Sequence, residues 1–352
     1  MLILADDLTG AADCGVQAVR RGLRATVSLR GVPPGVAADV LAIDLDTREG
    51  SAEDARERTR AAVRDAGLLY VKLDSRLRGH VGAAIEGALE GAEAEVAVVA
   101  PAFPAQGRIP ALADLVERLR SQTSRPVRSG LDLETPGIVA CDAADDADLA
   151  RIAAAGRAAG RRVVWAGSAG LAAALFEGMP AGAGSRAAVE AAPGCAVLAV
   201  VGSPAAASQL EALLARPGCV GIAVDPADAA RAGEAARDVL ARGGDAVLHL
   251  EPGTPDLGRE HAPRIAAALA GAAAAAIEPA AGLLLTGGET ARAVCDRAGL
   301  ISIDLIAEVE PGVPLGRTGT PARAIVTKSG GFGRADTLVA ALDAIKEHCA
   351  CR

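Results

Sequence analysis

Two neighbouring carboxylates near the start of the chain, Asp6 and Asp7, are the first residues whose types and spacing could do chemistry. They follow the short apolar run Leu2–Ala5 and precede Thr9 and Asp13. Either Asp7 or Thr9 could cap the first turn of a helix, where an acid also offsets the helix dipole. A cap needs only one such residue, so this set of acids exceeds that need. Because neighbouring side chains diverge, we expect one acid to accept a proton from a substrate hydroxyl and the other to orient the loop.

Cationic side chains follow two further apolar runs and indicate an anionic ligand. Arg48 comes soon after Val40–Asp44 and could grip a carboxylate with its planar guanidinium, although a surface ion pair in front of a helix would explain it equally well. Later in the chain, two cations, a carboxylate and a hydroxyl occur together: Lys72, Asp74, Ser75 and Arg78. Basic residues at a helix start oppose the helix dipole, so a purely structural role explains them poorly. With the backbone N–H groups of a helix start, they are suited to binding an anion.

Small residues form three strand-to-helix turns in the second half of the chain. They are Val201–Pro204, Thr286–Thr290 and Lys328–Gly333. One such turn is common, but three on one domain favour a cradle of backbone N–H groups for a polyphosphate. The turns match neither the Gly-x4-Gly-Lys-Ser/Thr loop nor the complete Gly-x-Gly-x-x-Gly fingerprint of dinucleotide-binding domains.

Apolar runs that alternate with Ala- and Leu-rich helical stretches must position these loops. They predict strands over Leu2–Ala5, Ala25–Leu29, Val40–Asp44, Leu68–Lys72, Val96–Ala100, Gly137–Ala140, Arg162–Ala166, Ala196–Val201, Gly221–Val224, Ala246–Leu250, Gly282–Thr286 and Ala324–Thr327. The alternation is typical of an α/β fold with two domains, each with a largely parallel sheet flanked by helices. A Gly- and Pro-rich stretch interrupts it, so we expect domains at 1–178 and 195–352 and a linker at 179–194. Ligands of such sheets bind beyond the carboxyl ends of the strands, where these loops lie.

The composition argues against several other functions. A net charge of −8 without a basic block, and an aromatic content of 1%, are unlike a nucleic-acid-binding protein. The four histidines are dispersed, so neither a histidine metal cluster nor a catalytic triad is indicated. The seven cysteines are scattered, and we expect reduced thiols. Because no signal peptide or membrane-spanning segment is recognisable, we expect a cytoplasmic protein without a membrane partner.

Taken together and in this order, several segments resemble the four-carbon acid sugar kinases, which include the YgbK-like proteins. The matching segments are ADDLTGAAD at 5–13, DLDTR at 44–48, KLDSRLRGHVG at 72–82, APAFPAQGR at 100–108, GSAGLA at 167–172, TGGETA at 286–291, PGVPLG at 311–316 and KSGGFGRAD at 328–336. The chain departs from the family pattern at Arg76 and His80, where Thr and Asn are usual. It is also shorter than expected after Arg108, near the implied substrate site.

The resemblance implies an N-terminal domain that binds an acid sugar and a C-terminal domain that binds ATP. It implies phosphorylation of the terminal hydroxyl of an acid such as 3-oxo-tetronate, threonate or erythronate. It places Asp7, Arg48, Lys72, Asp74, Ser75 and Arg78 in the acid-sugar site, to which we add Asp6. The nucleotide site that it implies consists of Ser203, Gly287, Gly288, Glu289, Thr290, Gly330 and Gly331. The implied substrates are thus ATP and a small sugar acid, with Mg²⁺ as cofactor, and a homodimer is compatible with the sequence.

On this basis we expect Asp7 to be the catalytic base. Arg48, Lys72 and Arg78 would hold the substrate carboxylate or stabilise developing charge, while glycine-loop amides and Mg²⁺ would hold the ATP phosphates. The sequence does not identify the metal ligands. A non-catalytic sensor of a sugar acid or nucleotide would use the same residues without turnover, and the shortened segment leaves that alternative open. A dinucleotide-dependent oxidoreductase would explain only the glycine turns, because the acidic ribose partner is missing at the usual offset.

Overall fold

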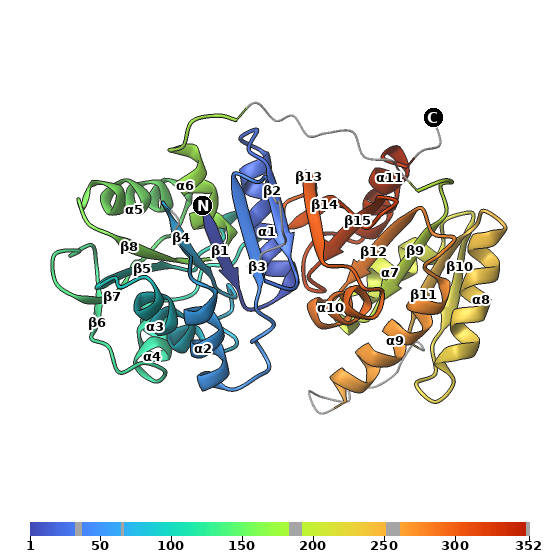
Figure 1. The fold of residues 1–352 in the computed structure, drawn as a ribbon, viewed down its shortest axis with the longest axis horizontal. Helices are drawn as coiled ribbons and strands as arrows, with labels where there is room; N and C mark the ends of the chain where they lie inside the picture. The colour runs from blue at the N-terminus through green and yellow to red at the C-terminus, as the bar shows by residue number, and fades with distance from the viewer. Residues whose placement is uncertain (32–36, 65–66, 183–191, 251–260, 350–352) are drawn as a thin grey trace. The chain divides into compact units, whose positions relative to one another are not determined.

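The computed structural model describes residues 1–31, 37–64, 67–182, 192–250 and 261–349, and Figure 1 shows the fold. The chain forms two compact units, Met1–Ser185 and Arg186–Arg352. Both contain a mostly parallel sheet with helices on its faces, which confirms the predicted α/β class. Residues 183–191 of the predicted linker lie outside the described part of the chain, so the linker stays a prediction.

The first unit is a parallel sheet with the strand order β2-β3-β1-β4-β8-β5-β7-β6. Its strands are β1 (Leu2–Ala5), β2 (Ala25–Ser28), β3 (Val40–Asp44), β4 (Leu69–Lys72), β5 (Val96–Ala100), β6 (Val127–Ser129), β7 (Gly137–Ala140) and β8 (Val163–Gly167). Its helices are α1 (Leu8–Val19), α2 (Ala52–Ala62), α3 (Val81–Gly91), α4 (Leu112–Arg120), α5 (Asp146–Ala158) and α6 (Ala169–Glu177), with a short 3-10 helix at Pro104–Gln106.

Helices cover both faces of this sheet. Helices α2, α3 and α4 pack side by side on one face, while α1, α5 and α6 pack together on the other (Figure 1). The chain leaves β1 towards β2 and β3 on one side and later returns to β4 on the other side. This reversal of strand order brings the loops after β1, β3 and β4 together at one point on the carboxyl edge of the sheet.

The strands of the first unit are buried on both faces, as their apolar sequences predict. Every residue of β1 (LILA), β4 (LYVK) and β5 (VAVVA) is buried. Small residues let the covering helices approach closely: Gly87 in α3 lies against the backbone carbonyl of Arg56 in α2, where a Cβ would clash. Tyr70 is a rare large side chain in this core, and its hydroxyl donates a 2.5 Å hydrogen bond to the carbonyl of Ser168.

The second unit has the strand order β10-β11-β9-β12-β15-β14-β13, in which β14 runs antiparallel to both neighbours and the other pairs are parallel. Its strands are β9 (Val197–Val201), β10 (Cys219–Ala223), β11 (Asp245–His249), β12 (Gly282–Thr286), β13 (Ser302–Glu310), β14 (Val313–Thr318) and β15 (Arg323–Lys328). Its helices are α7 (Ala207–Leu214), α8 (Ala229–Ala241), α9 (Ala262–Ala276), α10 (Gly288–Arg297) and α11 (Thr337–Glu347), with a 3-10 turn at Pro204–Ala206. Helices α8, α9 and α10 pack together on one face, and α7 packs with α11 on the other (Figure 1).

Three strands, β6, β13 and β14, are absent from the sequence-based prediction. The sequence of β13, SIDLIAEVE, is interrupted by acids and is only partly buried. Strands β13 and β14 form an antiparallel hairpin with no helix between them, so the strand–helix alternation that guided the prediction gives no signal there. Strand β6 has only 3 residues.

Two sequence-based expectations concern the membrane and the thiols. No helix in the described ranges combines the length and the apolar character needed to cross a bilayer. Free thiols are found at Cys14, Cys141, Cys219, Cys295 and Cys349. Cys195 is disulfide-bonded, so the expectation of reduced thiols is wrong at that position.

Candidate functional site

The predicted acid and cation loops of the first unit meet at the carboxyl ends of β1, β3 and β4. Ala5, the last residue of β1, pairs with Asp44 at the end of β3 and with Lys72 at the end of β4. Asp6 and Asp7 follow immediately, so they emerge between the two neighbouring loops. The backbone carbonyl of Asp6 accepts a hydrogen bond from Arg48 N at 3.2 Å, which ties the β1 and β3 loops together.

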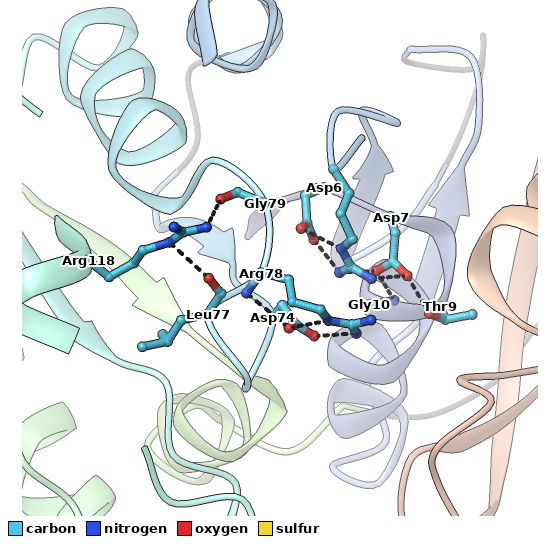
Figure 2. A network of polar contacts seen from close by, with 10 residues as sticks. Asp6, Asp7, Thr9, Gly10, Asp74, Leu77, Arg78, Gly79 and Arg118 are labelled. Carbon is cyan, nitrogen blue, oxygen red and sulfur yellow. Dashed lines mark hydrogen bonds and ion pairs between the residues drawn. The ribbon is translucent and has the colours of Figure 1, made fainter. Parts of the chain in front are cut away.

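Arg48 binds both carboxylates of the first loop. Its Nε and Nη2 atoms donate to Asp6 Oδ2 and Oδ1 at 2.8 and 2.7 Å, and Nη2 also donates to Asp7 Oδ1 at 2.8 Å. Nη1 lies 2.7 Å from Asp7 Oδ2, and the Arg48 side chain is only 14% exposed. Figure 2 shows Asp6 and Asp7 facing the same guanidinium. The charge of Arg48 is therefore already balanced by carboxylates of the protein itself.

Asp7 also caps helix α1, so the capping interpretation of this residue holds alongside any chemical one. Its Oδ1 accepts from Gly10 N at 2.9 Å and its Oδ2 accepts from the Thr9 hydroxyl at 2.6 Å. Burial alone would raise the pKa of Asp7, but the positive charges of Arg48 and Lys72 and these hydrogen bonds hold it below its ordinary value. Asp7 is thus an ionised acceptor at neutral pH.

Lys72 is the cation of this site that carries no direct ion pair. Its side chain is buried, and within the described residues its ammonium has neither a hydrogen-bonded nor an ion-paired partner. Burial disfavours the charge, but the electrostatic influence of Cys14 and of the carboxylates of Asp7, Asp6 and Asp13 holds the pKa of Lys72 above its ordinary value. Gly10 makes room for this arrangement, because a Cβ there would lie 2.6 Å from Asp7 Oδ1 and 2.8 Å from Lys72 Nζ.

A small pocket adjoins this group of charges on the side of α2 and α3. Asp6, Thr47, Thr59, Lys72 and His80 contribute its polar lining, and apolar residues, mainly of β1, β4 and the two helices, complete it. His80 is held in place by a 2.7 Å hydrogen bond between its Nε2 and the carbonyl of Gly50. The pocket lining thus includes both the carboxylate of Asp6 and the ammonium of Lys72 at the end of the sheet.

The loop after β4 contains a second ion pair. Arg78 donates from Nε and Nη2 to Asp74 Oδ2 and Oδ1 at 2.8 and 2.9 Å (Figure 2). Asp74 is buried, and although burial would raise its pKa, the hydrogen bonds of Arg78 and the charge of Arg48 hold that pKa well below the ordinary value. Ser75, the next residue along, is also buried. The structure thus brings all seven predicted acid-sugar residues to the loops at one end of the sheet.

Helix α4 fixes the shape of this loop, which the sequence did not indicate. Arg118 donates to the carbonyls of Leu77 and Gly79 at 3.1 and 3.0 Å (Figure 2). Gln122, just beyond the end of α4, donates to the same Gly79 carbonyl at 3.1 Å. Leu77 has a left-handed φ of 58°, which side chains rarely adopt, so the loop needs such external support. In the sequence, Arg118 is one of two arginines on an amphipathic helix, and nothing distinguishes it.

The predicted glycine turns of the second unit also meet. They follow β9, β12 and β15, which are neighbours in the sheet. Gly202 N donates to the Thr286 carbonyl at 3.3 Å, and Gly287 N donates to the Lys328 carbonyl at 2.8 Å. Gly330 packs directly against the Ser203 side chain, so even a methyl group there would clash. The three turns therefore form one continuous backbone surface.

Gly287 and Gly288 form the start of helix α10. Gly287 adopts a φ of 94°, a conformation that favours glycine, and serves as the N-cap without a side-chain hydrogen bond. Glu289 lies in the first turn, and Thr290 is buried against Gly202. Backbone N–H groups at the start of this helix can bind an anion, as the sequence predicts.

Lys328 is a residue of this second group that the sequence-based list of candidates lacks. Its side chain is completely buried, and Nζ donates to the carbonyls of Ser329, Phe332 and Gly330 at 2.7, 2.8 and 3.3 Å. Burial lowers the pKa of Lys328 to about 8. Its place inside a Gly-rich segment was a signal in the sequence, but its three carbonyl partners could not be read from it.

Among the residues that the structure describes, no three His, Cys, Asp or Glu side chains are grouped to hold a metal ion.

Comparison with known proteins finds a match in each half of the chain. Residues 1–116 and 109–175 match a family described as a sugar-binding N-terminal domain, and residues 198–338 match a nucleotide-binding C-terminal domain. The chain is 35% identical to D-threonate kinase of Cupriavidus necator over 98% of both chains. It is also 35% identical to D-threonate kinase of Bordetella bronchiseptica over 98% of this chain and 97% of the relative. A solved structure from Salmonella typhimurium LT2 shares the fold with a TM-score of 0.77 and 18% identity over 98% of this chain and 99% of that chain.

Proposed function

Because this chain belongs to the four-carbon acid sugar kinase family, we propose that it transfers the terminal phosphoryl group of ATP to a hydroxyl of a four-carbon sugar acid. D-threonate is the first substrate to test, since both relatives that match along their length carry that name. The terminal hydroxyl is the acceptor that we propose. Sugar acid and nucleotide would bind to the first and second units, as the two family descriptions suggest.

The observation that carries this proposal is the group of Asp6, Asp7, Arg48 and Lys72 at the end of β1, β3 and β4. It combines an ionised acceptor with an ammonium that has no direct ion pair in the described residues. A sugar acid presents both complements, namely hydroxyl groups that donate hydrogen bonds and a carboxylate that needs a cation. Stability alone explains this group poorly, because a buried charge without a direct ion pair destabilises the folded protein.

We assign the role of base to Asp7. Phosphoryl transfer passes through a loose transition state, so the base need only orient the hydroxyl and take its proton late. A carboxylate of lowered pKa can do this, provided that it stays ionised. Asp7 stays ionised because Arg48 binds both of its oxygens, which makes Arg48 a positioning residue as well as a cation of the site.

The cations of the first unit would then differ in their tasks. Arg48 and Arg78 are bound to Asp6, Asp7 and Asp74. Lys72 retains an ammonium without such a partner among the described residues, so it is our first choice for the substrate carboxylate or the charge that develops during transfer. Asp74 and Ser75 would add hydrogen bonds to the sugar hydroxyls.

The nucleotide would be held by the backbone of the three turns. Amides of Gly287, Gly288, Gly330 and Gly331, with the hydroxyls of Ser203 and Thr290, suit the oxygens of a polyphosphate. Mg²⁺ would neutralise part of the phosphate charge, and Glu289 in the first turn of α10 is the carboxylate that we propose as its protein contact.

Formation of ADP on a panel of acids tests the proposal. Purified protein is mixed with MgATP and with D-threonate, D-erythronate or 3-oxo-tetronate, and ADP is measured against ATP alone. We expect acid-dependent ADP from at least one of the three, with phosphorus NMR showing a new phosphate ester on the terminal carbon. Binding of an acid and of ATP without ADP formation would instead identify a non-catalytic sensor, and binding of neither would remove the proposal.

A further inference from the structure

The glycine segment after β15 folds around one buried ammonium. Lys328 is the last residue of β15, and its Nζ donates hydrogen bonds to three of the next four carbonyls: Ser329, Gly330 and Phe332. Gln209 of α7 donates to the Phe332 carbonyl as well, at 2.9 Å. A lysine with 0% exposure is rare in any protein, and this chain has few lysines to place.

Because the peptide bond is planar, hydrogen bonds that fix the direction of a carbonyl also fix the direction of the N–H group of the next residue. In a trans peptide, the C=O and N–H groups point in opposite directions. The carbonyls of residues 329, 330 and 332 turn towards Lys328 Nζ, so the N–H groups of Gly330, Gly331 and Gly333 turn away from it. Two of these three amides belong to residues that we assign to the polyphosphate.

The surroundings of Lys328 make this an unusual lysine. Glu310 of β13 is the charged group that favours its protonation, whereas burial opposes it and lowers the pKa of Lys328 to about 8. Two uncharged side chains lie nearby: Gln209 shares the Phe332 carbonyl, and Thr286 lies opposite Lys328 in strand β12. The ammonium is thus compensated mainly by carbonyl dipoles and could lose its proton near neutral pH.

We propose that Lys328 is a positioning residue of the nucleotide site, whose ammonium holds the carbonyls of the 329–332 segment and thereby aims the amides of Gly330, Gly331 and Gly333 at the phosphates. The inference rests on the proposed use of a nucleotide. A purely structural lysine would satisfy the same carbonyls but would leave nucleotide affinity unchanged once the protein is folded. The two roles therefore differ in nucleotide affinity and in its pH dependence.

The first measurement is ADP binding by calorimetry to the wild type, to Lys328→Met and to the control Lys346→Met. Methionine keeps the length of the side chain but removes its donors. Lys346 lies on the half-exposed surface of α11, paired with Asp245, and is outside the glycine turns. We expect the ADP dissociation constant to rise at least tenfold in Lys328→Met and to stay within twofold in Lys346→Met. The KM for the sugar acid should not change in either variant.

The second measurement needs no substitution. Wild-type ADP affinity is measured between pH 7.5 and 9.5, where the ADP phosphates are already ionised. We expect affinity to fall several-fold across this range as Lys328 loses its proton. Gln209→Leu, which removes the second donor to the Phe332 carbonyl, should weaken ADP binding less than Lys328→Met and should keep the pH dependence.

The outcomes separate this inference from the proposed function. If the wild type binds no nucleotide, the proposed function fails and Lys328 has no nucleotide to position. If the wild type binds ADP but folded Lys328→Met binds it equally well, the positioning role is wrong and the kinase proposal stands. If Lys328→Met does not fold, a wild-type affinity that is flat from pH 7.5 to 9.5 rejects the role, and a falling affinity supports it.

Discussion

The two units both place candidate anion-binding groups at the carboxyl ends of parallel strands, but they use different groups to do so. The first unit relies on charged side chains, in which Arg48 and Arg78 are bound to Asp6, Asp7 and Asp74. The second unit relies on backbone amides from three glycine turns, with the buried ammonium of Lys328 behind one of them. The difference matches the proposed ligands, since a sugar acid has hydroxyl groups to orient and a polyphosphate has only acceptors.

The two units should also respond differently to substitutions and to pH. In the first unit, removal of one charge leaves its partners buried and unpaired, so stability and chemistry are lost together. In the second unit, we expect substitution of Lys328 to change the direction of neutral amides. Acid should affect the first unit, whose carboxylates have lowered pKa values, and alkali should affect the second. The following predictions test this contrast in order of decreasing effect.

The largest effect is expected from Asp7→Asn. Asparagine keeps the size of the side chain and can still accept hydrogen bonds at the helix cap, but it cannot accept the proton of the substrate hydroxyl. We expect kcat to fall by about 10²–10⁴-fold, measured as ADP formation at saturating acid, with the KM for ATP little changed. Asp39→Asn serves as the control, because Asp39 is a half-exposed carboxylate that pairs with Arg24. Near-normal turnover of Asp7→Asn would end the assignment of Asp7 as the base, though not the kinase proposal.

Loss of Arg48 should produce the largest change in stability. Arg48→Met leaves Asp6 and Asp7 facing each other without a cation between them, and the Arg48 side chain is only 14% exposed. We expect the free energy of unfolding in urea to fall by about 3–5 kcal/mol. The matched control is Arg24→Met, which removes another arginine–aspartate pair whose side chains are 38% and 36% exposed, and it should cost about 1 kcal/mol or less. Equal losses in the two variants would show that the Asp6–Asp7–Arg48 group does not behave as a buried charge network.

The sequence was sufficient to find the loops but not the partners inside them. Asp6, Asp7, Arg48 and Lys72 could be singled out because each follows an apolar run, and ligands bind at the ends of such strands. Whether Arg48 binds a ligand or a protein carboxylate depends on the distance between the loops after β1 and β3. A local sequence pattern does not reveal that distance. The sequence favoured both interpretations of Arg48 equally, and the geometry shows the ion pairs with Asp6 and Asp7.

The residues that the sequence missed act through long-range contacts. Arg118 reaches the carbonyls of Leu77 and Gly79 from a helix about forty positions further along the chain, as the sequence separations of 41 and 39 residues show. Lys328 differs, because its Gly-rich motif is recognisable in the sequence but the burial of its side chain is not. Periodicity predicts which face of an element is buried, whereas these two roles depend on which backbone carbonyls remain unpaired after the loops have folded.

Acid should weaken the first unit before the second. The pKa values of Asp7 and Asp74 are lowered in the folded state, so their stabilising contribution is complete above the unfolded-state pKa of about 3.9 and is lost as the pH falls below it towards the folded values. We expect the free energy of unfolding to be level from pH 7 to 5 and to drop by about 1–3 kcal/mol by pH 3. Fluorescence of Trp165 in β8 reports on the first unit in urea titrations at each pH. In Asp74→Asn the drop should be smaller, and an unchanged drop would assign the acid sensitivity to other carboxylates.

The smallest predicted effect has the opposite direction and concerns the second unit at alkaline pH. Because the pKa of Lys328 is lowered to about 8 in the folded protein, the cost of burying its charge is complete below pH 8 and is relieved as the pH rises towards the unfolded-state pKa of about 10.4. Stability should therefore increase by about 1 kcal/mol between pH 8 and 9.5, while ADP affinity falls over the same range. Amide hydrogen exchange in α11, corrected for the intrinsic pH dependence of exchange, measures this increase, with α3 of the first unit as the internal control. Lys328→Met should abolish the increase, since methionine has no charge to lose. A decrease in protection of α11 over this range would mean that the protonated ammonium stabilises the fold, and burial would then not be the dominant influence on Lys328.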